Sequence, residues 1–455
     1  MATGNSKNIW TDNSCIIPQE DYFNDCNYEI IYPDKCSVSE IINFQPKNIY
    51  KELFHNDDTN KIYFGENLDV LSHLYHNLCY LNKINLIYID PPFGTNSIFQ
   101  TRNQKNSYKD DLTGSHYLEF MRRRLAFLRE LLTADGSIFV HLDNNMVFQI
   151  KIIMDEIFGG KNFRGFITRK KCSNKNYTKN TFGNISDYIL FYSKTDTYKW
   201  HRPVEIWSDE KIDKEYPYFD EPTGRRYKKV PIHAPGVRNG ETGKPWKGML
   251  PPPGKHWQYT PDKLTEFDNN GEIYWSANGN PRRKVFLDEE KGVPVQDIWL
   301  NLQDSLNQNI KITGYPTEKN PYLLERIINA SSDVGDIVLD CFAGSGTTLD
   351  VANQLGRKYI GIDNSYEAIS NIIKRFSLGL EKMGDYVNGN NEFDDTPQGL
   401  FVFCPEAEYN IDNVSSINFS FFSDNRYVDI SKHLLDKYLS DITKDGIYKM
   451  AIKTY

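Results

Sequence analysis

The order of apolar and polar residues predicts alternating strands and helices in two separate parts of the chain. Apolar runs typical of buried strands occur at Leu86–Ile89, Ser137–Leu142, Tyr188–Tyr192, Ile337–Cys341 and Tyr359–Ile362. Segments with apolar residues at helical spacing lie between several of these runs. Strands that alternate with helices predict a mostly parallel, doubly wound α/β sheet.

Residues 196–309 separate the two parts and have a different texture. Gly and Pro are dense there, as at Pro251–Gly254, and are mixed with Trp, Tyr, Lys and Arg. This pattern predicts a loop-rich insertion rather than more sheet. The expected segments are an N-terminal arm (1–45), the first half of the core (46–195), the insertion (196–309), the second half of the core (310–384), a linker (385–398) and a C-terminal module (399–455).

The composition is that of a folded globular protein of more than one domain, with 455 residues of which 39% are hydrophobic and 14% aromatic. No apolar run approaches the roughly 18 residues that span a bilayer, and Met1–Trp10 lacks the pattern of a signal segment, so we expect no membrane association. The seven cysteines are an odd number without a Cys-x-x-Cys pair. We therefore expect no metal site, no disulfide framework and a cytoplasmic location.

The formal net charge of −8 hides an asymmetry. Residues 161–291 contain 25 Lys and Arg against 17 Asp and Glu, a balance of +8, so the rest of the chain carries −16. A basic module on an acidic body can bind DNA through its phosphates. The candidate DNA-binding residues are Arg169, Lys170, Lys171, Arg225, Arg226, Lys228, Lys229, Arg282, Arg283 and Lys284. The alternative is that these residues form ordinary solvated faces.

A first motif, Asp90-Pro91-Pro92-Phe93, follows the strand Leu86–Ile89 directly. A carboxylate at the carboxyl end of a parallel strand lies where open α/β sheets hold ligands. Two consecutive prolines fix the backbone and remove two N–H donors. Together with the aromatic ring, they predict a rigid set of acceptors beside a stacking surface, suited to a planar ring that carries an NH₂ group.

A second motif, Phe342–Thr348, follows the strand Ile337–Cys341 and contains Gly344 and Gly346. Glycines at a strand-to-helix turn let a ligand approach the backbone, and the helix N-terminus favours an anion. The next strand ends in Asp363, an acid suited to the two ribose hydroxyls of an adenosine. The third glycine of the dinucleotide fingerprint is missing, which favours adenosine binding over pyrophosphate binding.

The two motifs, in this order and about 250 residues apart, resemble those of the beta-group amino-methyltransferases of DNA, which include modification subunits of restriction systems. Supporting matches are Gly65–Leu68, Asp135–Ile138 and Gly314–Lys319. The chain departs from the family pattern at Glu66, where Asp is usual, at Phe93, where Tyr is commoner, and at Asn320, where Pro is usual. Asn320 and Pro321 should still begin a helix.

The resemblance implies a Rossmann-like core that binds S-adenosyl-L-methionine and methylates the exocyclic amine of adenine in double-stranded DNA after base flipping. It implies catalytic roles for Asp90, Pro91, Pro92 and Phe93. The implied cofactor residues are Glu66, Asn67, Thr317, Lys319, Asp340, Phe342, Ala343, Gly344, Ser345, Gly346, Thr347 and Asp363. Methylation of the cytosine amine, or a non-catalytic DNA-recognition subunit of the same fold, are the alternatives.

Other charged residues of the core are expected to have ordinary surface or structural roles. Arg122, Arg123 and Arg124 are expected to form a solvated helix face, and His141 to be structural. The insertion is expected to recognise the DNA target. A cognate restriction subunit and a homodimer are the further partners that the resemblance implies.

Overall fold

The computed structural model describes residues 28–57, 59–92, 98–100, 106–109, 114–172, 180–288, 291–304, 318–379 and 417–444. Its contacts divide the chain into two compact units. The first contains the described residues up to Pro203 and those from Gln296 onward, and the second is Val204–Val295. Each is described by itself.

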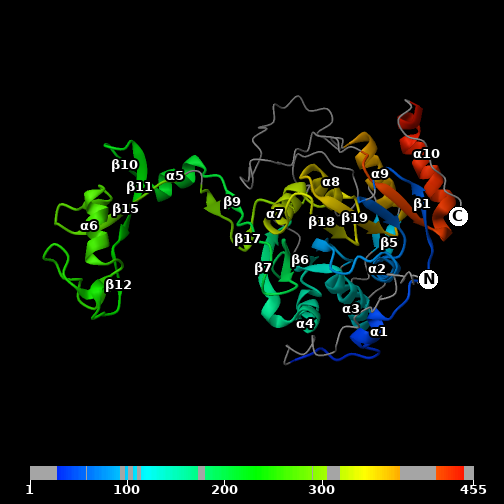
Figure 1. Ribbon diagram of the computed structural model, residues 1–455, viewed down its shortest axis with the longest axis horizontal. Coiled ribbons are helices and arrows are strands. Elements are labelled where there is room, and N and C mark those ends of the chain that lie inside the picture. The colour runs from blue at the N-terminus through cyan, green and yellow to red at the C-terminus, as the bar shows by residue number, and fades with distance from the viewer. Residues whose placement is uncertain are drawn as a thin grey trace, which may run out of the picture. The chain divides into compact units, whose positions relative to one another are not determined.

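The first unit is built on a ten-stranded sheet in the order β1-β20-β2-β19-β18-β3-β6-β8-β7-β17 (Figure 1). The strands in this order are Tyr50–Phe54, Ser420–Asp424, Lys61–Phe64, Lys358–Asp363, Ile337–Asp340, Ile84–Ile89, Leu132–Leu142, Ser186–Ser193, Phe163–Lys170 and Ile298–Trp299. All neighbours from β20 to β6 are parallel, whereas β8 runs antiparallel to both β6 and β7. The predicted mostly parallel α/β fold is confirmed.

Helices cover the two faces of this sheet. On one face pack α1 (Val38–Ile42), α2 (Asn67–His76), α3 (Gly114–Leu131) and α4 (Val147–Phe158). The other helices of the unit are α7 (Pro321–Ser331), α8 (Thr347–Gln354), α9 (Tyr366–Leu378) and α10 (Val428–Lys444). Helix α7 contacts α8, and α9 contacts α10.

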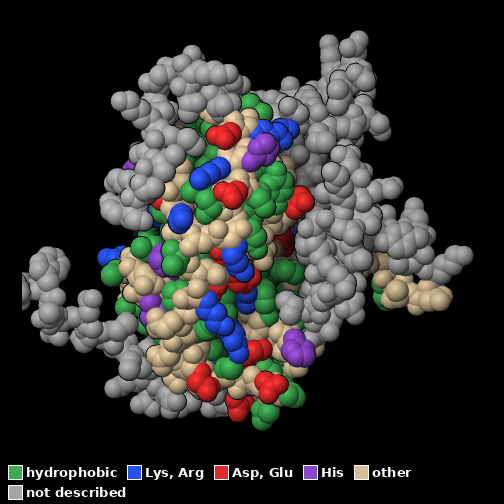
Figure 2. All heavy atoms as spheres, turned by 90° about the vertical axis from the view of Figure 1, so that its right-hand side faces the viewer, with side chains coloured by type: hydrophobic (Ala, Val, Ile, Leu, Met, Phe, Trp, Pro, Cys, Tyr) green, Lys and Arg blue, Asp and Glu red, His purple; other side chains and the backbone are tan. Residues whose placement is uncertain are grey.

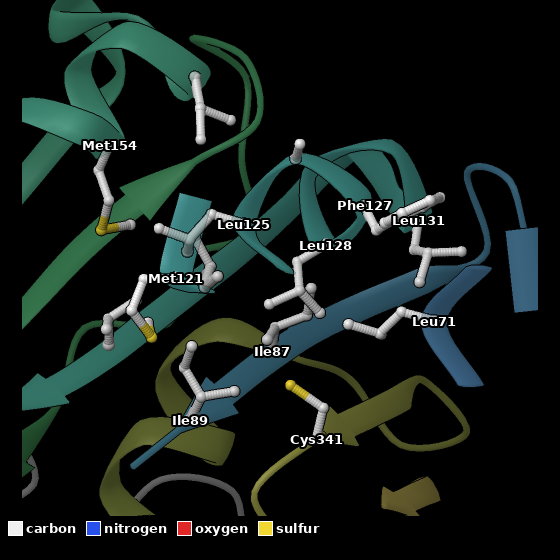
Figure 3. Close-up of a cluster of buried hydrophobic side chains, with 14 of the residues drawn as sticks. Leu71, Ile87, Ile89, Met121, Leu125, Phe127, Leu128, Leu131, Met154 and Cys341 are labelled. Atoms are coloured by element: carbon white, nitrogen blue, oxygen red, sulfur yellow. The ribbon is translucent and has the colours of Figure 1, made fainter. Parts of the chain in front are cut away.

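The apolar side chains of the strands and helices meet in a continuous core. Figure 3 shows Met121, Leu125 and Leu128 of α3 directed toward Ile87 and Ile89 of β3. All five side chains are fully buried, so the strand that leads into Asp90 is held by packing along its length.

On the opposite face, Gly361 of β19 makes room for α8. A Cβ atom at this position would lie 2.3 Å from Cδ1 of Leu349. The absent side chain therefore lets α8 approach the sheet closely. This helix begins at the turn that contains Gly344 and Gly346, called the glycine turn below.

The two ends of the described chain contribute to the first unit. In the arm, Ser37 and Glu40 form a capping box at the start of α1, and Ile41 and Ile42 of this helix are buried. Residues 417–444, expected to form a terminal module, contribute β20 to the sheet and the helix α10. Strand β20 lies between β1 and β2.

The second unit contains an antiparallel sheet of four strands in the order β10-β11-β15-β14. These strands are Tyr218–Asp220, Arg225–Pro231, Pro281–Phe286 and Ile273–Trp275. Smaller pairs join β12 (His233–Pro235) with β13 (Lys255–Trp257) and β9 (Val204–Glu205) with β16 (Val293–Pro294), and the helices are α5 (Asp209–Glu215) and α6 (Pro261–Asn269). The expectation of a loop-rich insertion rather than more sheet was wrong for these strands, because β11 and β15 carry Lys and Arg instead of a continuous apolar run and β10 and β14 are only three residues long.

The second unit has its own small core around Trp246, Trp257, Leu264 and Phe267. Residues on either side of this unit belong to the first unit, where Trp200 stacks on Phe191 and β17 pairs with β7. Among the described helices, none combines the length and the apolar composition needed to cross a membrane. The cytoplasmic location stays a prediction.

Candidate active site

Three carboxylates mark the same edge of the main sheet. Asp90 follows β3, Asp340 ends β18 and Asp363 ends β19. These three strands are adjacent and parallel, so their carboxyl ends meet at one edge, where open α/β sheets hold ligands. The two sequence motifs, far apart in the chain, are therefore brought together.

Asp340 accepts two hydrogen bonds from the segment Phe342–Thr348, which contains the glycine turn. Its Oδ1 accepts the backbone N–H of Phe342 at 3.0 Å, and its Oδ2 accepts the hydroxyl of Thr348 at 2.6 Å. Burial raises the pKa of Asp340 to about 7, against these two hydrogen bonds, and the charge of Asp90 adds to the rise. The side chain is buried, and its two hydrogen bonds stabilise the conformation of the turn.

Asp363 reaches the same turn from the neighbouring strand. Its Oδ2 accepts the N–H of Gly344 and its Oδ1 accepts the N–H of Ser365, both at 2.9 Å. Burial raises the pKa of Asp363 to about 6, while these backbone hydrogen bonds oppose the rise. The N–H of Asn364 lowers the pKa in the same way. A carboxylate has about four lone-pair positions, so capacity remains to accept a further hydrogen bond.

The turn itself depends on its two glycines. Gly344 and Gly346 have φ angles of 52° and 77°, a region that other residues rarely adopt. Gly346 is the N-cap of α8 and makes no side-chain capping bond, and a Cβ atom on it would lie 2.8 Å from Ile372. The turn thus presents backbone close to where a ligand would lie at the start of α8.

Glu66 and Asn67, at the start of α2, join this edge through Arg124. Arg124 donates to Oδ1 of Asn67 at 2.6 Å and forms an ion pair with Glu66, while Asn67 donates to the carbonyl of Cys341 at 2.8 Å. Asn364 donates to Glu66 at 3.2 Å. These contacts link the start of α2 to the ends of β18 and β19.

The buried position of Arg124 corrects a sequence interpretation. Arg122 and Arg124 were expected to be solvated, yet both are buried, and Arg122 donates to the carbonyl of Cys36. Arg123 is the more exposed neighbour and pairs with Glu119 one turn away. Arg124 is a residue of the candidate site that sequence reasoning missed, because charged residues along a helix are usually solvated.

Asp90 is held by Lys319. Nζ of Lys319 lies 2.8 Å from Oδ2 of Asp90, and both side chains are mostly buried. The other oxygen, Oδ1, is buried and has no hydrogen-bond partner among the described residues. Pro91 and Pro92 follow in irregular backbone, whereas Phe93 and Thr317 lie outside the described residues.

Glu318, next to Lys319, belongs to a second buried network. Arg375 of α9 pairs with Glu318 and with Asp350, and it donates to the carbonyl of Ser345 and the hydroxyl of Thr347, each at 3.0 Å. The residue before Lys319 is therefore tied to the glycine turn through Arg375.

Beneath Asp90, a chain of buried polar residues crosses the sheet. The hydroxyl of Tyr88 lies 2.8 Å from Nδ1 of His141, whose Nε2 lies 2.9 Å from Asp187. Arg169 donates twice to Asp187 and once to Asp304, at 2.8 Å. Burial lowers the pKa of His141, which keeps the ring neutral.

Arg169 is fully buried in this network, so its placement among DNA-binding residues was wrong. Its guanidinium group donates hydrogen bonds to Asp187 and Asp304 and is not accessible to a DNA phosphate. Burial alone would lower the pKa of Arg169, but the two carboxylates raise it above its usual value. Lys170, the last residue of β7, and Lys171 directly after it are half-buried.

The basic residues of the second unit are largely engaged with neighbours. Four of the candidate DNA-binding residues form ion pairs there: Arg226 with Asp213, Lys228 with Glu215, Arg283 with Glu272, and Lys284 with Asp220. Lys229 lies between the rings of Tyr218 and Tyr274, and Arg225 lies over Phe286. Arg282 is exposed. This local pairing is what the alternative of ordinary solvated faces expects, so the DNA-binding role stays a prediction.

On the face shown in Figure 2, the coloured acidic and basic side chains are interspersed. Among the described residues, no group of three or more His, Cys, Asp and Glu side chains is arranged to hold a metal ion.

Comparison with known proteins agrees with this geometry. The model of a DNA methylase family, N6_N4_Mtase, matches residues 84–375. The type II methyltransferase M.EcaI of Enterobacter cloacae is 53% identical over 306 residues, which cover 67% of this chain and 67% of that protein. The Mod subunit of the type III restriction-modification enzyme StyLTI of Salmonella typhimurium is 31% identical, over 69% of this chain. The match spans 52% of that subunit, about half its length.

Solved structures are more distant. The M1.HpyAVI–SAM complex is 18% identical with a TM-score of 0.37, and the match covers 70% of this chain and 99% of that one. The cytosine-N4-specific PvuII DNA methyltransferase is 16% identical with a TM-score of 0.41, over 72% and 90% of the two chains. Because both scores are low, the assignment rests on the family model and the sequence matches. The chain belongs to the N6_N4 family of DNA methylases.

Proposed function

We propose that this chain transfers a methyl group from S-adenosyl-L-methionine to the exocyclic amine of adenine in double-stranded DNA. The observation that carries the proposal is Oδ1 of Asp90, a buried carboxylate oxygen with no partner among the described residues. Leaving a buried acceptor unpaired costs about 1–3 kcal/mol, so such an atom at a ligand-binding edge favours an incoming donor. The N–H of an aromatic amine is a donor of that kind.

The residues at the ends of β18 and β19 fit the adenosyl cofactor. Asp363 keeps acceptor capacity for a ribose hydroxyl, and the two glycines of the turn let the cofactor approach the backbone at the start of α8. Bound there, the cofactor supplies an activated methyl group on a sulfonium. Glu66 and Asn67 lie at the same edge, and Asp340 stabilises the turn by accepting the N–H of Phe342.

The chain's own residues would then act on the base. The lone pair of an aromatic amine is delocalised into the ring, which makes the nitrogen a poor nucleophile. Acceptance of an amine hydrogen by Oδ1 of Asp90, and of the second by a backbone carbonyl near Pro91, would bias the nitrogen toward tetrahedral geometry. Phe93 is proposed to stack on the base. The paired base must leave the duplex first, at a cost of roughly a few kcal/mol.

Adenine is proposed over cytosine because Asp stands at the first position of the motif, which in the resembling family accompanies adenine. The amine of cytosine is the second candidate, since it offers the same two hydrogens to the same acceptors. We also propose that the second unit recognises the target sequence. A cognate restriction subunit is proposed from the name of the StyLTI relative, whereas a homodimer stays a prediction from the family resemblance.

The proposal is tested with purified chain, methyl-labelled S-adenosyl-L-methionine and unmethylated genomic DNA. Hydrolysis of the DNA and mass spectrometry of its nucleosides should show labelled 6-methyladenine. Labelled 4-methylcytosine instead would establish the second candidate. Absence of label in DNA, with cofactor binding intact by calorimetry, would favour a non-catalytic recognition subunit.

A further inference from the structure

Residues 318–320 form a short buried segment that contacts both halves of the candidate site. Glu318 reaches the glycine turn through Arg375, and Lys319 pairs with Asp90. Asn320 caps α7 by accepting the N–H of Tyr322 at 3.0 Å, and it donates to the carbonyl of Gln303 at 2.9 Å. Each side chain of the segment is therefore engaged.

The buried surroundings of residues 318–320 restrict where the side chain of Lys319 can lie. All three residues are buried, and the backbone enters a helix at Pro321 directly after them. A lysine side chain normally loses rotamer entropy when it is immobilised. Here its neighbours on both sides are already anchored, and its ammonium meets a carboxylate at 2.8 Å.

The ion pair uses one oxygen of Asp90 and leaves the other open. Lys319 contacts Oδ2, while Oδ1 stays without a partner among the described residues. Without the ammonium, the carboxylate could rotate about its side-chain torsions and turn Oδ1 away.

We propose that Lys319 is a positioning residue for methyl transfer: it holds Oδ2 of Asp90 so that Oδ1 faces the target amine. This inference rests on the proposed function and adds to it, because the family resemblance placed Lys319 only among the cofactor residues. Misplacing a reacting group by about 1 Å can cost on the order of 100-fold in rate. Loss of Lys319 should therefore lower the rate of transfer itself, in addition to any effect on cofactor affinity.

The test compares Lys319→Met, Lys319→Gln and Lys319→Arg with the unmodified chain. Single-turnover methyl transfer is measured at saturating S-adenosyl-L-methionine, and affinity for S-adenosylhomocysteine is measured by calorimetry. Lys199→Met is the matched control, since Nζ of Lys199 lies 2.6 Å from Asp336 in a pair of similar burial. Circular dichroism checks that each variant folds.

The neutral variants should transfer methyl groups about 10- to 100-fold more slowly at saturating cofactor. Lys319→Arg should recover most of the lost rate, and Lys199→Met should keep the full rate. A normal rate for the neutral variants once cofactor is saturating would overturn the inference and leave Lys319 a cofactor residue. An equal loss in the Lys199 control, or no recovery with arginine, would also overturn it. If the unmodified chain transfers no methyl group, the proposed function fails instead.

Discussion

Oδ2 of Asp363 accepts the backbone N–H of Gly344 at 2.9 Å, which joins the end of β19 to the glycine turn after β18. The same carboxylate accepts the N–H of Ser365 at the start of α9. Asp363 thus organises the edge of the sheet while retaining acceptor capacity for a ligand. The proposed binding of ribose makes this residue the first target for mutation.

Asp363→Ala should weaken binding of S-adenosylhomocysteine at least tenfold, because hydrogen bonds to a charged acceptor contribute about 1.5–3 kcal/mol each. Isothermal calorimetry measures the change. Thr348→Val serves as a comparison, since it removes the hydroxyl that Asp340 accepts but leaves Asp363 in place. Unchanged affinity in Asp363→Ala would place the adenosine pocket elsewhere.

Cofactor affinity should also depend on pH. Burial raises the pKa of Asp363 to about 6, so this group is ionised at about pH 8 and becomes protonated as the pH falls through 6. A protonated carboxyl uses one oxygen as a donor and accepts ribose hydroxyls less well. If only the ionised form binds, affinity should fall toward tenfold for each pH unit below about 6.

Calorimetry with S-adenosylhomocysteine between about pH 8 and pH 5 follows this dependence. Asp363→Asn is the control, because an amide does not titrate in this range. The variant should bind more weakly at about pH 8 and lose the transition near pH 6. A transition that persists unchanged in the variant would assign it to another group, with Asp340 next in line because its pKa is about 7.

Arg124→Met should destabilise the chain by about 2 kcal/mol, because it leaves Oδ1 of the buried Asn67 without its donor and removes the ion pair with Glu66. It should also weaken cofactor binding, since Asn67 bonds to the carbonyl of Cys341 beside the glycine turn. Arg123→Met, one residue earlier, removes a partly exposed pair with Glu119 and a weak hydrogen bond to Sγ of Cys36, and should cost less than about 1 kcal/mol. Urea titration compares the two, and equal losses would contradict the role given to Arg124.

Replacing Arg225, Arg226, Lys228 and Lys229 with glutamine should weaken DNA binding and flatten its salt dependence. Each phosphate contact that is lost should reduce the logarithmic slope by about 0.9. The control replaces four other lysines of the second unit, Lys211, Lys244, Lys263 and Lys291, which carry the same total charge. Binding is measured by fluorescence anisotropy at several salt concentrations. Equal behaviour of the two variants would mean that the first cluster is a solvated face paired with local acids.

The parallel sheet could be predicted because its strands are apolar on both faces, as at Leu86–Ile89 and Ile337–Cys341. The glycine turn could be predicted because Gly344 and Gly346 follow such a strand and precede a helix. Both features depend on residues that are close together in the sequence.

Other features depend on contacts between distant segments. Nothing near Lys319 in the sequence indicates Asp90 as its partner, and nothing near Arg169 indicates a buried network with Asp187 and Asp304. Arg124 could not be distinguished from its partly exposed neighbour Arg123, because both lie in the same charged stretch of α3. A charged residue is buried only when its partners arrive from elsewhere in the fold.

The proposed methyl transfer depends most directly on Asp90, so the decisive measurement is the rate of 6-methyladenine formation by Asp90→Ala. The variant should form no detectable 6-methyladenine in DNA under single-turnover conditions, because the acceptor of the target amine is gone. It should still bind S-adenosylhomocysteine, since Asp363 and the glycine turn are unchanged. Turnover near that of the unmodified chain, with cofactor bound, would contradict the account.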